Sequence, residues 1–193
     1  MAKGKREAIL KAAVRVFARE GFFKSRVEAV AKEAGVATGT TYLYFENKDD
    51  ILISIFDEEM TPIIDDMKRE IAEQKSAVDK IRTFIRRHLV MVQEQPDMAQ
   101  LLIVELRQSN KFLHTYSGTK FKEYLNIIAS IFEQGQQEGV FRQDIKPTIF
   151  KQVMFGAVDQ ISTNWALSRT KKLDLNETGE QIADIIMNGA LQK

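Results

Sequence analysis

The chain has 193 residues, with 44% hydrophobic and 28% charged residues, a composition typical of a globular protein with one or two small domains. It contains no cysteine, which excludes disulfides, thiolate metal sites and cysteine nucleophiles. Neither a run of about eighteen apolar residues nor a signal-peptide pattern occurs, so we expect a cytoplasmic protein without a membrane partner.

Charge is distributed unevenly along the chain, although the formal net charge is only +1. Residues 1–32 hold nine Lys or Arg against three Glu, and the remainder is mildly acidic. A basic end on an acidic body is typical of a protein that meets a polyanion through that end. A solvated helical face would give the same asymmetry, so charge alone leaves both interpretations open.

The first helices are predicted by apolar residues at helical spacing. Residues 10, 13, 14 and 17 follow this spacing, and Gly21 stands where a helix would end. Ser25 and Glu28 form an S-x-x-E capping box, which predicts a second helix of about ten residues that ends near Gly35.

A tight turn at residues 35–37 leads to a third short helix, predicted over Thr38 to Tyr44. Thr41 and Phe45 are four residues apart on its buried face. Asn47 is expected to cap a fourth helix, whose first turn carries two aspartates that the helix dipole favours.

Residues 51–193 are predicted to form five or six longer helices, separated near Pro96, at 109–117, at Gly139 and Pro147, and over 169–178. No strand pattern and no internal repeat is found in the sequence. The predicted fold is all-α with about nine helices. We expect an N-terminal helix-turn-helix domain over residues 1–48, a fourth helix that starts near 47 as the link, and a C-terminal helical ligand-binding and dimerisation domain over 49–193.

Two short helices joined by a tight turn in a basic module are typical of helix-turn-helix proteins, whose second helix enters the major groove of DNA. Thr38, Gly39 and Thr40 are small enough for a close approach to the duplex. Tyr42 and Tyr44 can donate to phosphates at the groove rim. The same residues would also serve as ordinary helix-start threonines and half-buried core tyrosines.

Together these residues resemble a known family signature. The pattern S-R-V-x-x-V-A-x-x-A-G-V-A-T-G-T-T-Y-L-Y-F-E-N-K-D-D-I-L, within residues 5–56, is similar to the N-terminal signature of the TetR family of bacterial transcriptional regulators. The resemblance implies a homodimeric repressor that binds a palindromic operator in double-stranded DNA and leaves it when a small molecule enters the C-terminal domain. The DNA-facing residues that it implies are Ser25, Arg26, Thr38, Gly39, Thr40, Tyr42, Tyr44 and Lys48.

Two residues depart from the family pattern. Ala37 replaces the Ser or Thr that often caps the recognition helix, and Thr41 replaces a Leu or Ile on its buried face. Because alanine cannot accept the N-terminal backbone N–H groups, the loss of the cap costs about 1 kcal/mol. We therefore expect a looser recognition helix in the free protein.

The last two predicted helices, near 147–167 and 177–191, are apolar on more than one side. The small residues Gly156, Ala157 and Gly189 would allow close helix approach. A homodimer through these two helices is one interpretation, with a four-helix interface. Packing within one subunit is the alternative.

A third cluster carries apolar and basic side chains over residues 84–113, a combination that suits a ligand with an apolar tail and an anionic head. The candidate ligand-binding residues are Phe84, Arg86, Arg87, His88, Met91, Leu102, Leu106, Arg107, Asn110 and Phe155. A helix pair with one core face and one solvated charged face would look the same.

ELRQSN (105–110) and YLYFENKDDILISIF (42–56) resemble segments of TetR-type regulators of fatty-acid degradation. That resemblance implies long-chain acyl-CoA as the effector and fatty-acid degradation genes as the targets. A repressor of multidrug efflux is the alternative within the family, and an acyl-CoA carrier without specific DNA binding is the alternative outside it. A drug-cation sensor would need carboxylates in its pocket, so the three arginines of the cluster favour the thioester.

No enzyme signature is found. The two histidines, His88 and His114, are not part of a metal-binding H-E-x-x-H, and the sequence has neither a phosphate-binding glycine loop nor G-x-S-x-G. We therefore expect no catalytic residues, no metal site and no cofactor other than the effector.

Overall fold

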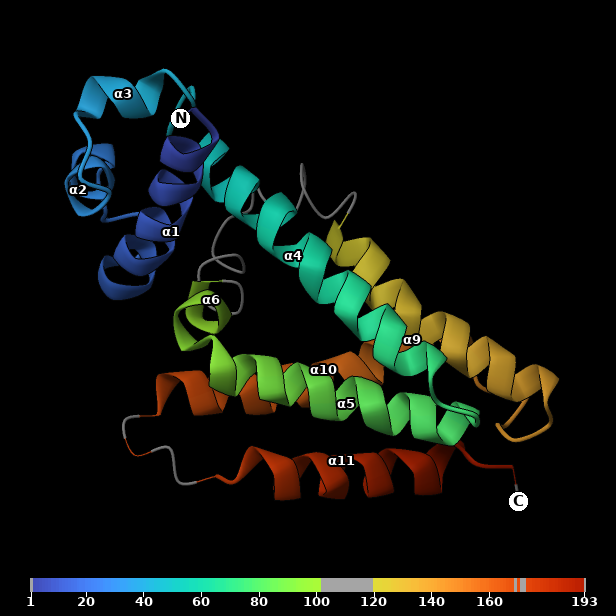
Figure 1. Cartoon of the computed structure of the whole chain (residues 1–193). Coiled ribbons are helices and arrows are strands. Elements are labelled where there is room, and N and C mark those ends of the chain that lie inside the picture. The colour runs from blue at the N-terminus through green and yellow to red at the C-terminus, as the bar shows by residue number, and fades with distance from the viewer. Residues whose placement is uncertain (1, 102–119, 169, 171–172, 193) are drawn as a thin grey trace.

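The computed structural model describes residues 2–101, 120–168, 170 and 173–192. Its described residues form nine α-helices, with one isolated β-bridge between Phe141 and Leu191. A small N-terminal unit lies at one end of a long helix, and the remaining helices pack along the other end (Figure 1). The all-α prediction is thus confirmed.

The N-terminal unit consists of α1 (Ala2–Glu20), α2 (Val27–Glu33) and α3 (Thr38–Tyr42). As predicted, α1 ends at Gly21, which takes a left-handed φ of 82° and donates its N–H to Phe17 O at 2.9 Å. The turn after α2 uses Gly35 in the same way, with φ 69°. The buried rings of Phe17, Phe22 and Phe45 are the largest side chains of this unit's core.

The predicted capping box at Ser25 is wrong. Arg26 is the N-cap of α2, without a capping side-chain hydrogen bond, and α2 has seven residues rather than about ten. The hydroxyl of Ser25 instead donates to Phe22 O at 2.8 Å. Ser25 is buried and its hydroxyl closes the turn that precedes α2, so it is not available to the helix terminus.

Helix α4 (Lys48–Ala72) begins at a reciprocal cap. As predicted, Asn47 Oδ1 accepts the N–H of Asp50 at 2.9 Å, and the carboxylate of Asp50 accepts the N–H of Glu46 at 2.9 Å. The helix continues without a break past the expected domain boundary. Ile55 packs in the N-terminal core and its neighbour Phe56 packs in the core of the body, so α4 belongs to both.

The body contains α5 (Ala77–Glu94), α6 (Pro96–Gln100), α9 (Lys120–Gln137), α10 (Pro147–Leu167) and α11 (Leu175–Ala190). Their ends lie near the predicted breaks: Pro96 and Pro147 occupy first turns, and Gly139 has a left-handed φ of 73°. Helix α5 packs against α4, α9, α10 and α11, which makes it the centre of the body (Figure 1).

Short helix α6 is the second connection between the two units. Its Met98, together with Leu101, packs in the N-terminal core, whereas Ala99 packs in the core of the body. The side-chain amide of Gln100 also donates to Ala18 O of α1 at 2.9 Å. The position of α1 therefore depends on α6, the helix that directly follows α5.

Candidate DNA-binding and effector sites

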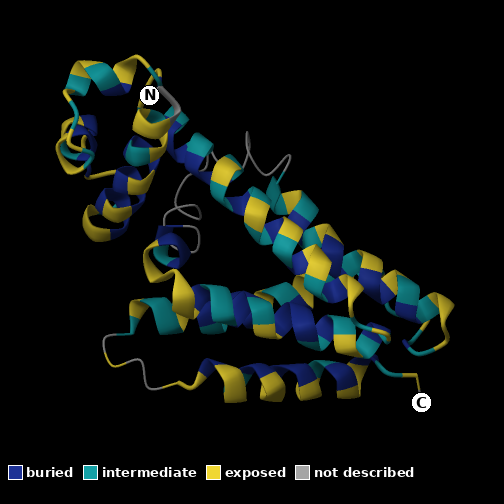
Figure 2. Cartoon of the chain, in the orientation of Figure 1, coloured by how far each residue is buried: buried dark blue, intermediate teal, exposed yellow. Residues whose placement is uncertain are grey.

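The residues predicted to face DNA lie on one end of the N-terminal unit. Arg26, Gly39 and Tyr42 are exposed, and Thr38, Thr40 and Tyr44 are half-buried. Figure 2 shows this end of the unit as a mixture of exposed and half-buried segments. Tyr44 also packs against the N-terminal core, so its ring is partly structural. These six residues come from the start of α2, from α3 and from the segment directly after it, which brings them together at the outer end of the molecule.

Helix α3 is short and weakly supported. Within the described residues no side chain caps it at Ala37, in agreement with the sequence. Thr41 is completely buried on its inner face, as predicted, and its hydroxyl finds no hydrogen-bond partner in the described part of the chain. A buried hydroxyl without a partner opposes folding by about 1 to 3 kcal/mol.

Ser25 and Lys48 are placed differently from the other predicted DNA contacts. Ser25 is only 3% exposed, and its hydroxyl is bonded within the turn. The ammonium of Lys48 donates to three carbonyl oxygens of the same turn, those of Phe22, Phe23 and Ser25. Neither side chain is thus free for a phosphate in this conformation.

Leu43 is a surface feature that sequence reasoning missed. Its side chain is 82% exposed, directly after the exposed ring of Tyr42 at the end of α3. An apolar side chain on a DNA-reading helix can contact a thymine methyl group. Its place directly after Tyr42 in the sequence, away from the buried face of Thr41 and Phe45, was the available signal.

In the body, three of the predicted ligand residues gather around aromatic rings of α9. The ring of Phe84 lies 5.0 Å from that of Tyr124, and Phe155 makes edge contacts with His88 at 6.0 Å and with Phe121 at 5.4 Å. Met91 is partly buried against the same core. Leu102, Leu106, Arg107 and Asn110 lie outside the described residues.

His88 is the middle of a buried polar chain that joins α9, α5 and α10. Its Nδ1 lies 2.8 Å from the hydroxyl of Tyr124, and its Nε2 lies 3.1 Å from the hydroxyl of Ser162. Ser162 donates its single proton to Val158 O at 2.9 Å, so it accepts from His88 Nε2–H. Nδ1 then accepts from the hydroxyl of Tyr124, so the donor and the acceptor of all three hydrogen bonds are assigned.

Burial favours the neutral forms of the His88 and Tyr124 side chains. It lowers the pKa of His88 from 6.5 to about 4 and raises the pKa of Tyr124 above its ordinary value of 10.0. Arg87 precedes His88 on α5, and its positive charge acts on the pKa of Tyr124 in the opposite direction. A basic residue is therefore the chain neighbour of the buried His88.

Arg86 and Arg87 share one carboxylate. Arg87 Nε lies 2.9 Å from Glu70, and a guanidinium nitrogen of Arg86 lies 3.3 Å from the other oxygen of the same group. Two guanidinium charges on one carboxylate leave a positive excess at the α4–α5 contact. That excess is suited to a further anionic group.

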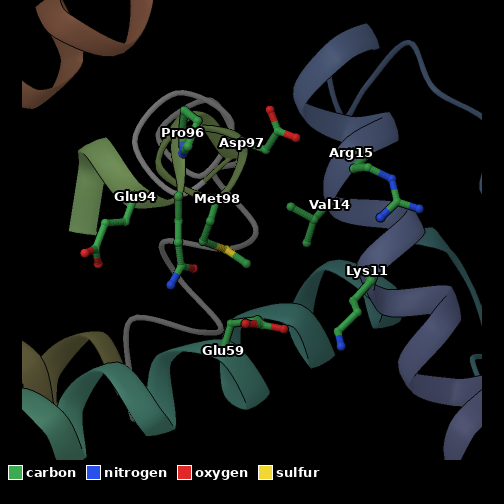
Figure 3. Close-up of a pocket in the computed structure, with 9 residues that line it drawn as sticks. Lys11, Val14, Arg15, Glu59, Glu94, Pro96, Asp97 and Met98 are labelled. Atoms are coloured by element: carbon green, nitrogen blue, oxygen red, sulfur yellow. The ribbon is translucent and has the colours of Figure 1, made fainter. Parts of the chain in front are cut away.

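A cleft of about 340 Å³ separates the N-terminal unit from the body, and no prediction placed a site there. Lys11, Val14 and Arg15 of α1 line one side, and Glu59 of α4 with Glu94, Gln95, Pro96, Asp97 and Met98 line the other. Figure 3 shows Lys11 directed toward Glu59. The lining of the cleft comes from α1, α4 and the junction of α5 and α6, and it includes none of the predicted ligand residues.

No described helix is long and apolar enough to cross a membrane. No group of three or more His, Cys, Asp or Glu in the described part could hold a metal ion.

The hydroxyl of Thr41, which has no hydrogen-bond partner in the described part of the chain, predicts a stabilising substitution. Thr41→Val keeps the β-branched shape and removes the hydroxyl, so the free energy of unfolding should rise by about 1 kcal/mol. Urea unfolding at equilibrium measures this change. Thr40→Val is the matched control and should change stability little, because Thr40 is half-buried on the outer side. A less stable Thr41→Val protein would contradict the interpretation.

The buried histidine predicts a pH dependence of stability. Because the pKa of His88 is lowered by folding, the unfolded chain binds an extra proton between about pH 6.5 and pH 4. Its contribution is fully present above pH 6.5 and is lost as the pH falls, by roughly 3 kcal/mol at pH 4. His88→Gln should flatten this part of the curve in urea titrations, and an unchanged slope would refute the assignment.

Comparison with known proteins agrees with this architecture in both units. Residues 9–55 match the family model described as bacterial regulatory proteins, tetR family, and residues 56–189 match the model described as the C-terminal region of YsiA-like proteins. The chain is 36% identical to the fatty acid metabolism regulator protein of Bacillus subtilis over 185 residues, 96% of this chain and 95% of that protein.

Solved structures give the same result. The FadR regulator of Bacillus subtilis, in complex with stearoyl-CoA, superimposes with a TM-score of 0.89 at 36% identity, over 95% of this chain and 98% of that one. The fatty acid degradation regulator FadR of Bacillus halodurans gives 0.89 at 33% identity, over 96% and 95%. The chain therefore belongs to the TetR family, and it is a DNA-binding transcriptional regulator rather than an enzyme.

Proposed function

We propose that this protein represses genes of fatty-acid degradation and leaves its operator when long-chain acyl-CoA binds in the body. The observation that carries the proposal is the similarity of the whole chain to the two Bacillus regulators of fatty-acid metabolism, one of which is in complex with stearoyl-CoA. The similarity covers the body as well as the N-terminal unit, and the body is where the effector would bind.

The DNA face consists of Arg26, Thr38, Gly39, Thr40, Tyr42 and Tyr44. Arg26 and Tyr42 are exposed and suit phosphates, whereas the small residues at the start of α3 let the backbone approach base edges. In a dimer, two copies of α3 would reach successive major grooves about 34 Å apart, which requires a palindromic operator.

The effector site combines two features of the body. The rings of Phe84, Phe121 and Phe155 supply apolar contact for an acyl chain. The guanidinium pair of Arg86 and Arg87, held by one carboxylate, supplies the positive excess for the anionic head. A hydrophobic cation, the effector expected of an efflux regulator, would be repelled by that excess.

We further propose a homodimer through α10 and α11. Val153 and Ile185 are 63% and 74% exposed, and Ile149 and Leu167 of α10 are exposed as well. A Cβ atom added at Gly156 or Gly189 would meet open space. Ile182 and Met187, by contrast, are buried in the subunit's own core, so each helix has one inner and one outer apolar face.

Acyl-CoA should release DNA from the protein. Fluorescence anisotropy of a labelled duplex, selected by the protein from a random pool, should fall on addition of micromolar long-chain acyl-CoA, but not of free CoA. Arg87→Met should raise the concentration required by about ten-fold, because it removes a desolvated charge contact. Release by hydrophobic cations instead would establish the efflux alternative.

Arg82→Met is the matched control for this experiment. Arg82 lies on the same helix, but its guanidinium pairs with Glu180 and Asp184 of α11, away from Glu70. Its substitution should leave the acyl-CoA response unchanged. Equal loss of response in both variants would show that Arg87 acts only through the stability of α5.

A charge in the apolar face of α10 and α11 should prevent dimer formation. Val153→Asp buries an unpaired carboxylate in the proposed interface, so sedimentation velocity should show monomers at concentrations where the wild type is a dimer. Leu43→Asp is the control, because this exposed leucine lies on the N-terminal unit and its substitution should leave the dimer intact. A dimeric Val153→Asp protein would rule out this interface.

A further inference from the structure

Lys48 occupies a closed cage of acceptors. Its ammonium donates to Phe22 O at 2.7 Å, to Ser25 O at 3.0 Å and to Phe23 O at 3.2 Å. It also lies 4.6 Å from the centroid of the Phe22 ring, within the range of a cation–π contact. An ammonium group has three N–H donors, so this one is fully occupied by the protein itself.

The cage joins two elements that are distant in sequence. Lys48 is the first residue of α4, and the three carbonyls belong to the turn between α1 and α2. Ser25 completes the arrangement, because its hydroxyl donates to Phe22 O, the same oxygen that accepts from Lys48. The buried serine thus helps to aim the carbonyls of this turn at one point.

A second cation fixes α4 to the N-terminal unit from the other direction. Arg6 of α1 forms an ion pair with Glu58 of α4, and its guanidinium carbon lies 5.1 Å from the centroid of the Phe45 ring. The beginning of α4 is therefore held at two places. Of these two cation contacts, that of Lys48 reaches the turn that leads directly into α2, so it helps to place α2 and α3 relative to α4.

We propose that Lys48 is a positioning residue: its ammonium latches the start of α4 to the turn between α1 and α2, and it supports DNA binding by placing α2 and α3. This role differs from the phosphate contact expected from the family signature. To reach a phosphate, the ammonium would have to abandon three carbonyls and an aromatic face. Loss of Lys48 should thus weaken DNA binding without removing a counterion-releasing contact.

The salt dependence of DNA binding separates the two roles. A phosphate contact contributes about 0.9 to the slope of log K against log salt concentration, and a positioning residue contributes nothing to it. With the duplex selected by the wild type, Lys48→Met should bind at least ten-fold more weakly at every salt concentration, with the wild-type slope. A slope reduced by about 0.9, or wild-type affinity, would overturn the proposal.

Two further variants sharpen the comparison. Arg26→Met, at an exposed position of the DNA face, should lower the slope and so shows that the measurement detects a lost phosphate contact. Lys48→Arg keeps the charge but replaces a compact group that donates in three directions by a planar fork. It should bind as weakly as Lys48→Met, and recovery of wild-type affinity in Lys48→Arg would argue against the latch.

Hydrogen exchange tests the latch without DNA, so it is independent of the proposed operator binding. In Lys48→Met the amides of residues 22–30 should exchange at least ten-fold faster than in the wild type, including Ser25 N–H, which donates to Gly21 O at 3.1 Å. Amides of α5 and α11 serve as the internal reference and should not change. Unchanged exchange in residues 22–30 would refute the latch even if DNA binding were weakened.

Discussion

The arrangement of the molecule depends on the burial of one continuous helix in two apolar cores. Ile55 and Phe56 are adjacent on α4 but lie in different cores. Each unit therefore needs part of this one helix to complete its core. Interiors are close-packed and do not deform gradually, so a displacement of the body end of α4 is transmitted to the N-terminal end. The cap at Asn47 and the cage around Lys48 then make that end part of the N-terminal unit.

The two units treat buried polar groups in opposite ways. In the body, His88, Tyr124 and Ser162 form a chain in which each donor has one acceptor, which holds α5, α9 and α10 in one arrangement. In the recognition helix, Thr41 is buried and its hydroxyl has no partner among the residues that the structure describes, and Ala37 supplies no cap. The buried polar groups of this part of the body are therefore paired, whereas α3 lacks both a cap and a partner for its buried hydroxyl among the described residues.

Helix ends were predictable because their signals are local. Gly21, Gly35 and Gly139 take left-handed conformations, Asn47 caps its own helix, and Pro147 starts one. Ser25 was assigned wrongly for the same reason: its S-x-x-E pattern is a valid local signal, but the buried turn offers its hydroxyl a better acceptor at Phe22 O. Lys48 could not be interpreted from spacing at all, because its three acceptors lie 23 to 26 residues away.

The sequence by itself determined the all-α class, the helix-turn-helix and the family, because periodicity, caps and a signature with almost no gaps are properties of neighbouring residues. It left open which apolar faces of α10 and α11 are inner and which are outer, and which cations are already paired. Only the tertiary structure decided that Met187 is core while Ile185 is exposed, and that Arg86 and Arg87 share Glu70. These outcomes depend on distances between segments that no local pattern encodes.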